Sequence, residues 1–450
     1  MTAFSYSKHI KETIALAYPV MIGQLGFMMM GVVDSLMVGE IGAAPLAAAS
    51  LANSLTMVIF IVSLGVAIAV TPLVAISNGA GNHNECEEYF KQSIVVNIFF
   101  GLITLTMIVI VSYFIQYLKQ PQEVIKQASS YTRILGLSII PVLIFHSYKQ
   151  FIEGLSFTKP AMYFSILANI VNAFTNWLLI FGNLGFPQLG LDGAGWATFM
   201  SRIFMAAGLI IYTNRSANFK DFHMSPIVHS INYSVIKKIL KLGLPSGFQY
   251  LFEVGAFSFA VVMVGWIGTK PLAAHQIAIS LASISFMIVL GISSAGGIRV
   301  GNALGKKDFY EARHAGITAI LLGISFMTLF GILFMSLNRF LPTLYINDQE
   351  VISIASSLII IAAIFQIFDG TQAVGIGVLR GLTDVKGPTV ITFIAYWVIG
   401  LPAAYLLGFI FELGVIGVWV GLLLSLAASA SMLTIRFLKK TKQLIKNYET

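Results

Sequence analysis

Twelve long runs of apolar residues constrain the fold of this chain most strongly, because each is about 20 residues long or longer. An α-helix needs about 20 apolar residues to cross the hydrocarbon core of a bilayer. Apolar and polar residues do not alternate within the runs as they do in the strands of a membrane barrel, so the runs predict helices. We expect twelve transmembrane helices at residues 14–38, 46–76, 92–117, 131–155, 161–182, 191–213, 238–267, 272–300, 313–337, 351–379, 388–409 and 414–437.

The composition excludes several other classes of protein. With 57% hydrophobic and 10% charged residues, the 450-residue chain cannot cover a water-facing surface with polar groups. A single cysteine, Cys86, excludes a disulfide framework and a cysteine-rich metal site. The net charge of +8 does not indicate a nucleic-acid partner, because the lysines and arginines sit in the gaps between apolar runs without a basic face. Most of these cations fall on one side of the predicted membrane, which places both termini in the cytoplasm.

The chain also contains an internal repeat. The segment Val33–Ala52, VDSLMVGEIGAAPLAAASLA, returns in the second half of the chain as Ala260–Ser280, AVVMVGWIGTKPLAAHQIAIS. Pro19 and Pro245 lie at the same offset as these two segments. Such a repeat predicts two structurally equivalent membrane halves with a site between them, and an even number of helices in each half makes the halves parallel.

We therefore expect an all-α integral membrane protein with twelve transmembrane helices in two parallel-repeat six-helix bundles. The predicted domains are an N-lobe at residues 1–213, a cytoplasmic linker at 214–237, and a C-lobe at 238–450 that ends in a basic cytoplasmic tail.

Three carboxylates fall inside predicted membrane helices: Asp34 in the first, Glu253 in the seventh and Asp369 in the tenth. An acid at bilayer depth costs at least about 2.5 kcal/mol, so it usually faces a cavity, finds a partner or titrates. No lysine or arginine lies within one helical turn of any of the three. Binding of an ion or a proton is therefore our hypothesis for them. The alternative is that each acid is protonated and hydrogen-bonded between helices.

Carboxamides accompany two of these acids. Gln249 precedes Glu253 by four residues, and Gln366 and Gln372 lie three residues on either side of Asp369, so they share a helical face with the acid. Carboxylate and carboxamide oxygens suit a hard cation, which makes Glu253 and Asp369 candidate ligands for Na⁺. They suit a shuttled proton as well. The sequence does not choose between Na⁺ and H⁺, and we expect no cofactor besides the coupling ion.

A second polar pocket is predicted in the first half of the chain. Asn169, Asn172 and Asn176 form one stripe on the fifth predicted helix, Thr198 lies in the middle of the sixth, and Asp34 belongs to the same half. The alternative is that these side chains only hydrogen-bond helices to one another.

Other side chains are candidates for the wall of a substrate cavity. Methionine adapts its shape and aromatic faces attract organic cations, which would suit a loosely selective pocket for bulky amphipathic cations. The expected partners are therefore small organic cations and drugs. The alternative is ordinary packing or lipid contact. The candidates for the cavity wall are Gln249, Gln276, Gln366, Gln372, Met30, Met37 and Phe365. No nucleophile–base pair and no zinc motif is present, so we do not expect an enzyme.

Several blocks of sequence, in order along nearly the whole chain, resemble the NorM branch of the multidrug and toxic compound extrusion (MATE) family. They include VDSLMVGEIGAAPLAA, LPSGFQYLFEVGAF, NIVNAFTNWLLIFG and FQIFDGTQAVGIGVLRG. The resemblance implies an exporter that alternates access to a central cleft and exchanges hydrophobic, often cationic drugs and dyes for Na⁺ or H⁺. We expect it to act as a monomer in the lipid bilayer of the bacterial inner membrane.

The resemblance also implies roles for individual residues. Asp34 matches the acid of the first helix in the family, with Asn172, Asn176 and Thr198 in polar positions. Glu253 and Asp369 match the acids that couple cation movement to transport.

In one respect the sequence departs from this pattern. Where relatives can carry a tyrosine four residues before the acid of the tenth helix, this chain has Phe365, so no phenolic oxygen is available at that position.

Three rival functions are a flippase for lipid-linked saccharides of a related fold, an ion channel and an intramembrane enzyme. A flippase for an anionic headgroup should favour a cationic cavity, whereas the buried charges predicted here are acidic. No segment resembles a selectivity filter, and no catalytic constellation is present.

Overall fold

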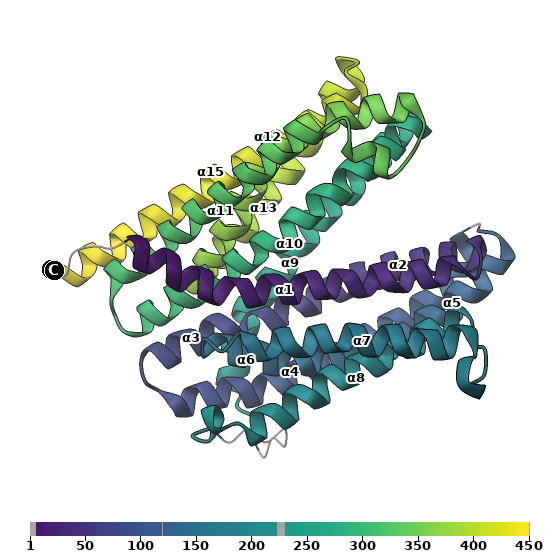
Figure 1. Cartoon of the computed structure of the whole chain (residues 1–450). Helices are drawn as coiled ribbons and strands as arrows, with labels where there is room; N and C mark the ends of the chain where they lie inside the picture. Colours follow the sequence, from purple (N-terminus) through teal and green to yellow (C-terminus); the bar gives the residue numbers. More distant parts are fainter. Residues whose placement is uncertain (1–5, 119, 223–229, 450) are drawn as a thin grey trace. The chain divides into compact units, whose positions relative to one another are not determined.

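The computed structural model describes residues 6–118, 120–222 and 230–449. All regular secondary structure in these residues is helical (Figure 1), and it forms twelve spans that are long and apolar enough to cross a membrane. The predicted fold class is therefore confirmed. The α-helices are α1 (Tyr6–Gly39), α2 (Ala43–Ile68), α3 (Val70–Gly79), α4 (His83–Phe114), α5 (Gln122–Leu137), α6 (Ile139–Gly154), α7 (Lys159–Phe181), α8 (Leu191–Arg215), α9 (Tyr233–Ile267), α10 (Thr269–Gly305), α11 (Phe309–Leu337), α12 (Gln349–Gly381), α13 (Lys386–Phe393), α14 (Leu401–Tyr405) and α15 (Gly414–Glu449).

Two of the predicted spans are each made of two helices. The predicted helix 46–76 consists of α2 and α3, and the predicted helix 131–155 begins earlier, at Gln122, and consists of α5 and α6. A proline explains both interruptions, because its ring nitrogen cannot donate to the carbonyl four residues before it. Pro72 lies four residues after the end of α2, and Pro141 lies four residues after the end of α5.

The span predicted at 388–409 is irregular as well. It runs from Lys386 to Ile410 and contains two stretches of π-helix, η5 (Ile394–Gly400) and η6 (Leu406–Ile410), on either side of α14.

The chain divides into two compact units. The N-unit comprises Ile22–Gly247, and the C-unit comprises Met1–Met21 together with Phe248–Thr450. Helices α1 and α9 therefore each begin in one unit and end in the other. In both helices the change comes two residues after an internal proline, Pro19 in α1 and Pro245 in α9.

The predicted lobes at 1–213 and 238–450 follow the sequence repeat, whereas the compact units follow the packing of the helices, so the prediction of the lobes stays a prediction. Part of the predicted linker at 214–237, residues 223–229, lies outside the described residues.

In each unit, the first half of α1 or α9 packs closely against a glycine, and the two glycines occupy equivalent positions of the repeat. Gly65 of α2 and Gly291 of α10 are related by the same offset as Pro19 and Pro245. A Cβ atom on Gly65 would lie 2.5 Å from the backbone nitrogen of Gly247, so the first half of α9 packs directly on α2 in the N-unit. A Cβ atom on Gly291 would lie 2.8 Å from the carbonyl oxygen of Ala17, so the first half of α1 packs directly on α10 in the C-unit.

The residues that precede and cap equivalent helices are also related by this offset. Gly42 and Gly268, with φ of 132° and 151°, precede α2 and α10, and these angles favour glycine. Asn82 and Asp308 cap α4 and α11, and each side chain accepts a hydrogen bond from the backbone N–H three residues later, at 3.1 and 2.9 Å. The sequence repeat is therefore a structural repeat.

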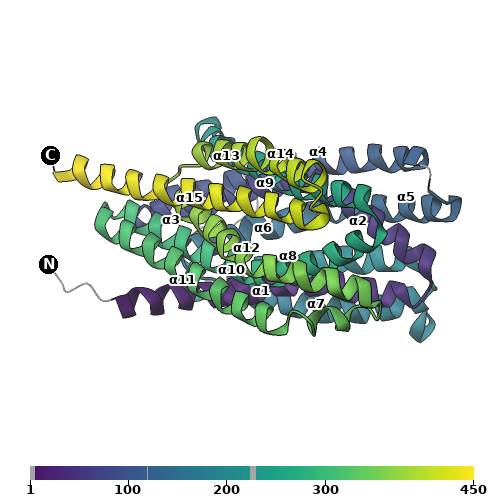
Figure 2. The ribbon, with the colours of Figure 1, turned by 90° about the horizontal axis from the view of Figure 1, so that it is seen from above.

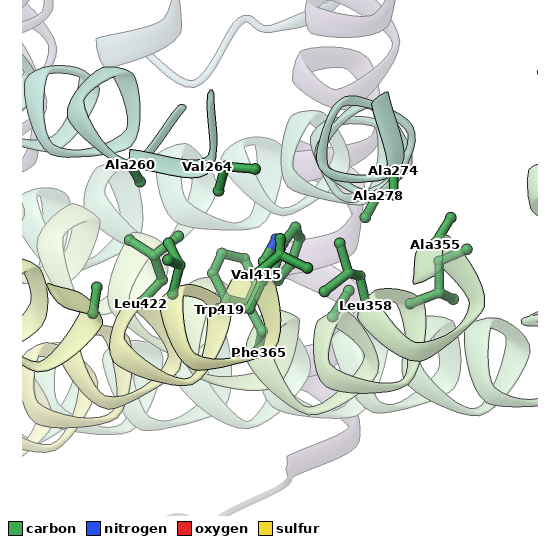
Figure 3. Packing of buried hydrophobic residues seen from close by; sticks show 14 of the residues in the cluster. Ala260, Val264, Ala274, Ala278, Ala355, Leu358, Phe365, Val415, Trp419 and Leu422 are labelled. Carbon is green, nitrogen blue, oxygen red and sulfur yellow. The ribbon is translucent and has the colours of Figure 1, made fainter. Parts of the chain in front are cut away.

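Each unit has its own apolar core. In the N-unit, buried side chains of α1, α2, α5, α7 and α8 form one cluster, which includes Val38, Tyr131 and Ile180. In the C-unit, α12 packs against α10, α11 and α15 (Figure 1, Figure 2). Figure 3 shows the centre of this second core, where Trp419 and Phe365 lie among aliphatic side chains from α9, α10, α12 and α15.

Candidate functional site

The polar side chains predicted as a second pocket in the first half of the chain lie together in the N-unit. Asn176 Nδ2 donates to Asp34 Oδ1 at 2.6 Å, and Thr198 Oγ1 donates to Asp34 Oδ2 at 3.0 Å. Asn176 Nδ2 also lies 3.2 Å from Asn172 Oδ1. All four side chains are buried. Each carboxylate oxygen of Asp34 therefore has one hydrogen-bond donor, supplied by helices other than its own.

Helices α7 and α8 position these donors. Asn172 and Asn176 are one turn apart on α7, and α8, which packs against α7, carries Thr198. The third asparagine of the predicted stripe, Asn169, instead donates to the carbonyl oxygens of Gly26 and Ser165, so it joins α7 to α1.

Sequence analysis missed a cation close to this pocket. Arg202 follows Thr198 by one turn on α8 and interacts electrostatically with Asp34. Its Nη1 donates to Ser138 Oγ, between α5 and α6, at 2.6 Å. A search along the helix of each acid could not find Arg202, because it reaches Asp34 from another helix.

The C-unit holds the other two acids. Glu253 of α9 and Asp369 of α12 are both buried and lie near enough for their carboxyl groups to interact electrostatically. Gln372 Nε2 donates to Glu253 Oε1 at 3.3 Å. In the described part of the chain, no side chain donates a hydrogen bond to Asp369. The structure thus places two buried carboxyl groups within electrostatic reach of each other, with one hydrogen-bond donor of normal geometry. Arg380, near the end of α12, interacts electrostatically with Glu253.

The three carboxamides predicted near these acids have different partners. Gln372 contacts Glu253, as just described. Gln249 lies near Glu253, although its buried Nε2 makes no hydrogen bond of normal geometry. Gln366 accepts a hydrogen bond from Ser285 Oγ of α10 at 2.8 Å, so its carboxamide oxygen is used to join helices.

The remaining wall candidates are dispersed. Phe365 is fully buried in the C-unit core against Trp419, and Met37 packs in the N-unit core. Gln276 is exposed. Met30 lies closest to a candidate pocket, since Ser201 Oγ, on the same turn of α8 as Thr198, donates to its sulfur at 3.7 Å.

A phenolic oxygen does reach the acidic site, from a helix that sequence analysis did not consider. Tyr396, in the π-helical stretch η5, is fully buried, and Gln372 Nε2 donates to its hydroxyl at 2.9 Å. It lies near enough to Glu253 and Asp369 for electrostatic interaction. No motif marks this residue, because its position depends on how the span from Lys386 to Ile410 packs on α9 and α12.

Helix α6 carries a second feature that sequence analysis missed. His146, Lys149, Gln150 and Glu153 have the spacing of one helical face, and all four side chains are at least nine-tenths buried. Lys149 Nζ lies 3.9 Å from Glu153 Oε1, and Thr71 of α3 hydrogen-bonds to Gln150. The 3- and 4-residue spacing could have revealed this stripe.

Three potential metal ligands, His9, Glu12 and Glu311, converge in the C-unit. The guanidinium group of Arg299 lies among them: its Nη2 is 2.8 Å from His9 Nδ1, 2.7 Å from Glu12 Oε2 and 3.0 Å from Glu311 Oε1. A metal cation does not fit beside this buried positive charge, so the group is an ion-pair cluster that joins α1 to α10 and α11.

Twelve spans, a repeat of six-span length and acids buried in each unit define a polytopic membrane protein organised like a secondary transporter. The sequence model of the MatE family matches residues 19–178 and 245–406, two stretches that begin at the equivalent prolines Pro19 and Pro245. The chain belongs to this family, the multidrug and toxic compound extrusion transporters.

Relatives and solved structures agree with this assignment. The chain is 34% identical over 440 residues to the probable multidrug resistance protein NorM of Rhizobium meliloti, covering 97% of this chain and 94% of that protein. It is 33% identical to the multidrug resistance protein MdtK of Proteus mirabilis, covering 96% and 95%. Its fold matches a crystal structure of MATE in the bent conformation, with a TM-score of 0.90, 19% identity, and 99% and 100% of the two chains covered. The eukaryotic MATE transporter AtDTX14 matches with a TM-score of 0.88, 21% identity, and 98% and 99% covered.

Proposed function

We propose that this protein is a secondary active multidrug exporter. It exchanges hydrophobic, cationic drugs and dyes for Na⁺ or H⁺ by alternating access. Relatives that are 32–34% identical over almost the whole chain are named as multidrug resistance proteins, which supports the class of cargo.

The observation that carries the proposal is the pair of buried carboxyl groups in the C-unit. Two ionised carboxylates side by side in a low-dielectric interior repel each other and lose hydration, so the pair holds a proton or a cation. Gln372 supplies one donor to Glu253, which is too little to compensate two negative charges. Asp34, by contrast, has a donor on each oxygen. Each site has an arginine within electrostatic reach, Arg202 of Asp34 and Arg380 of Glu253, so the difference lies in the hydrogen bonds and in the second carboxyl group of Asp369. Glu253 and Asp369 are therefore the first residues to load the coupling ion, and Asp34 is the second coupling candidate.

Coupling follows from the energetics of this pair. An ion shifts a conformational equilibrium only as far as its affinities for the two states differ. Loading of Glu253 and Asp369 from outside neutralises the site and weakens its attraction for a cationic drug, which is then released. Return of the ion to the cytoplasm restores the negative charge, and the next drug binds.

A flippase for lipid-linked saccharides remains the alternative, and the charges disfavour it. An anionic headgroup calls for a cavity with net positive charge. In the described part of the N-unit, the buried Lys149 lies close to Glu153, and the partly buried Arg202 interacts with Asp34.

We further propose that the protein lies in a bacterial inner membrane with both termini in the cytoplasm. Twelve spans, an even number, support termini on the same side of the membrane. The uneven distribution of lysine and arginine between the loops supports the cytoplasm as that side.

The test is exchange in proteoliposomes. The purified protein is reconstituted at equal pH inside and out, an inward Na⁺ gradient is imposed, and counterflow of a fluorescent organic cation is followed. A pH gradient then replaces the Na⁺ gradient in a parallel experiment. We expect counterflow with one of the two gradients, and its loss in the Glu253→Gln and Asp369→Asn variants. Glu123→Gln, the same change at an exposed acid of α5, serves as the matched control. Coupled export by both acid variants at the wild-type rate would refute the proposal.

A further inference from the structure

The π-helical stretch η5 is an unusual element beside the acidic site. A π-helix bonds each N–H to the carbonyl five residues earlier, is rare, and occurs mostly as short insertions at functional sites. Here it spans Ile394–Gly400 within a membrane-spanning segment. Pro402, two residues after the stretch, has no N–H to donate to the carbonyl of Val398 four residues earlier, which interrupts the α-helical pattern inside η5.

Tyr396 in this stretch is connected to Glu253 through one carboxamide. Gln372 Nε2 is 2.9 Å from the Tyr396 hydroxyl and 3.3 Å from Glu253 Oε1. A carboxamide nitrogen carries two hydrogens, so one can point to the phenol and the other to the carboxyl group. The Tyr396 hydroxyl in turn donates to Gln372 Oε1 at 3.2 Å, so the phenol contacts both ends of the carboxamide and leaves the second N–H of Nε2 toward Glu253.

The next residue of η5 holds the same stretch against α9. Trp397 Nε1 donates to the carbonyl oxygen of Phe252, the residue before Glu253, at 3.0 Å. A Cβ atom on Gly255 would lie only 3.2 Å from the Trp397 ring, so the ring lies directly on the backbone of α9. Phe393, just before η5, contacts Phe252 with ring centroids 5.0 Å apart. The position of Tyr396 relative to Glu253 is thus fixed by contacts on both sides of the acid.

We propose that Tyr396 is a positioning residue of the coupling site: it keeps the N–H end of Gln372 directed at Glu253 and so favours the ion-free carboxylate. This inference rests on the proposed function and names a further residue of the same site.

The N–H of Gln372 and the coupling ion compete for the same oxygen of Glu253. A donor on Glu253 Oε1 stabilises the ionised carboxylate without an ion, and therefore opposes its loading and promotes release of the ion. Without the phenolic hydroxyl, the carboxamide can rotate and present its oxygen instead. A carboxamide oxygen is a good Na⁺ ligand and a good acceptor for a protonated carboxyl group, so the loaded form gains stability with either ion.

The Tyr396→Phe variant tests the proposal, because it removes the hydroxyl and keeps the buried ring. A hydrogen bond to a charged group contributes enough to change an affinity by roughly tenfold. We therefore expect the coupling-ion concentration for half-maximal drug counterflow to fall by about tenfold. The maximal rate should fall as well, because ion release is slowed, while the half-saturating drug concentration stays the same. A purely structural role would lower the rate without moving the ion dependence.

Two further variants make the result decisive. Gln372→Met removes the donor itself and should also lower the half-saturating ion concentration, whether or not Tyr396→Phe folds well. Tyr405→Phe makes the same chemical change at a half-exposed tyrosine of the same span and should leave the ion dependence unchanged. An unchanged or increased half-saturating ion concentration in both Tyr396→Phe and Gln372→Met would overturn the inference.

Failure of this inference can be told apart from failure of the proposed function. If Glu253→Gln abolishes coupled export but the ion dependence of Tyr396→Phe is wild-type, only the role of Tyr396 is refuted. If Glu253→Gln itself exports with normal coupling, the proposed function is refuted, and the role of Tyr396 is refuted with it.

Discussion

Replacement of Gly65 by alanine should destabilise the protein, although alanine is the better helix former. The added Cβ atom would lie 2.5 Å from the backbone nitrogen of Gly247 and 2.9 Å from the carbonyl carbon of Ser246, whereas ordinary contacts lie at 3.4–4 Å. Both atoms belong to the backbone of α9, so no side chain can rotate away. Helices α2 and α9 must separate by about 1 Å, as the shorter of these contacts requires.

The expected magnitude follows from two opposing contributions. Overpacking of this kind costs about 1–3 kcal/mol, and separating two helices along a glycine contact lies toward the upper end of that range. The gain in helix propensity from glycine to alanine is about 1 kcal/mol. We expect the free energy of unfolding of Gly65→Ala to decrease by about 1–2 kcal/mol.

The matched control is Gly31→Ala in α1. A Cβ atom at Gly31 has no neighbour within 4 Å, so only the propensity gain of about 0.5–1 kcal/mol applies. The assay is the fraction of detergent-solubilised protein that stays monodisperse after heating. Gly65→Ala should melt below the wild type and Gly31→Ala at or above it. If Gly65→Ala melts as high as Gly31→Ala, the close packing of α9 on α2 is refuted.

Two further predictions concern ion pairs. Arg299→Met removes the donors that join α1 to α10 and α11, and because the two glutamate partners are partly exposed and can rehydrate, we expect a loss of only about 2 kcal/mol. Arg339→Met, at an exposed site, should leave the melting temperature unchanged, and equal melting of the two variants would contradict this role. For Asp384, burial alone raises the pKa, but hydrogen bonds from Arg436 at 2.6 Å and Lys440 lower it below its usual 3.8. A lowered pKa in the folded state means stability that is present above pH 3.8 and lost as the pH falls through the folded value, so Asp384→Asn should cost about 1 kcal/mol at pH 7 and progressively less below pH 4. A gap in melting temperature that stays constant between pH 7 and pH 3 would refute this assignment.

Much of the candidate site was predictable from local patterns. The polar residues Asn172, Asn176 and Thr198 do converge on Asp34, because an acid in an apolar helix requires donors and few other side chains could supply them. Glu253 and Asp369 lie near each other as well.

The predictions for single carboxamides were less accurate for a physical reason. Spacing along a helix shows which side chains share a face, but not which neighbouring helix that face meets. Gln366 shares a face with Asp369 and yet bonds Ser285 of α10, whereas Tyr396 has no sequence signal and yet contacts Gln372.

The sequence by itself determined the number of membrane spans, the helical fold and the internal repeat, because these depend on hydropathy and identity along the chain. It did not predict the breaks within the spans at 46–76 and 131–155, although Pro72 and Pro141 mark them, because other prolines, Pro19 and Pro245, lie inside unbroken helices. Only the tertiary structure decided that α1 and α9 change units after Pro19 and Pro245, and that η5 brings Tyr396 to the acidic site. Those features depend on contacts between helices far apart in the chain, and an apolar helix surface packs against many partners equally well until shape, small residues and buried polar groups select one.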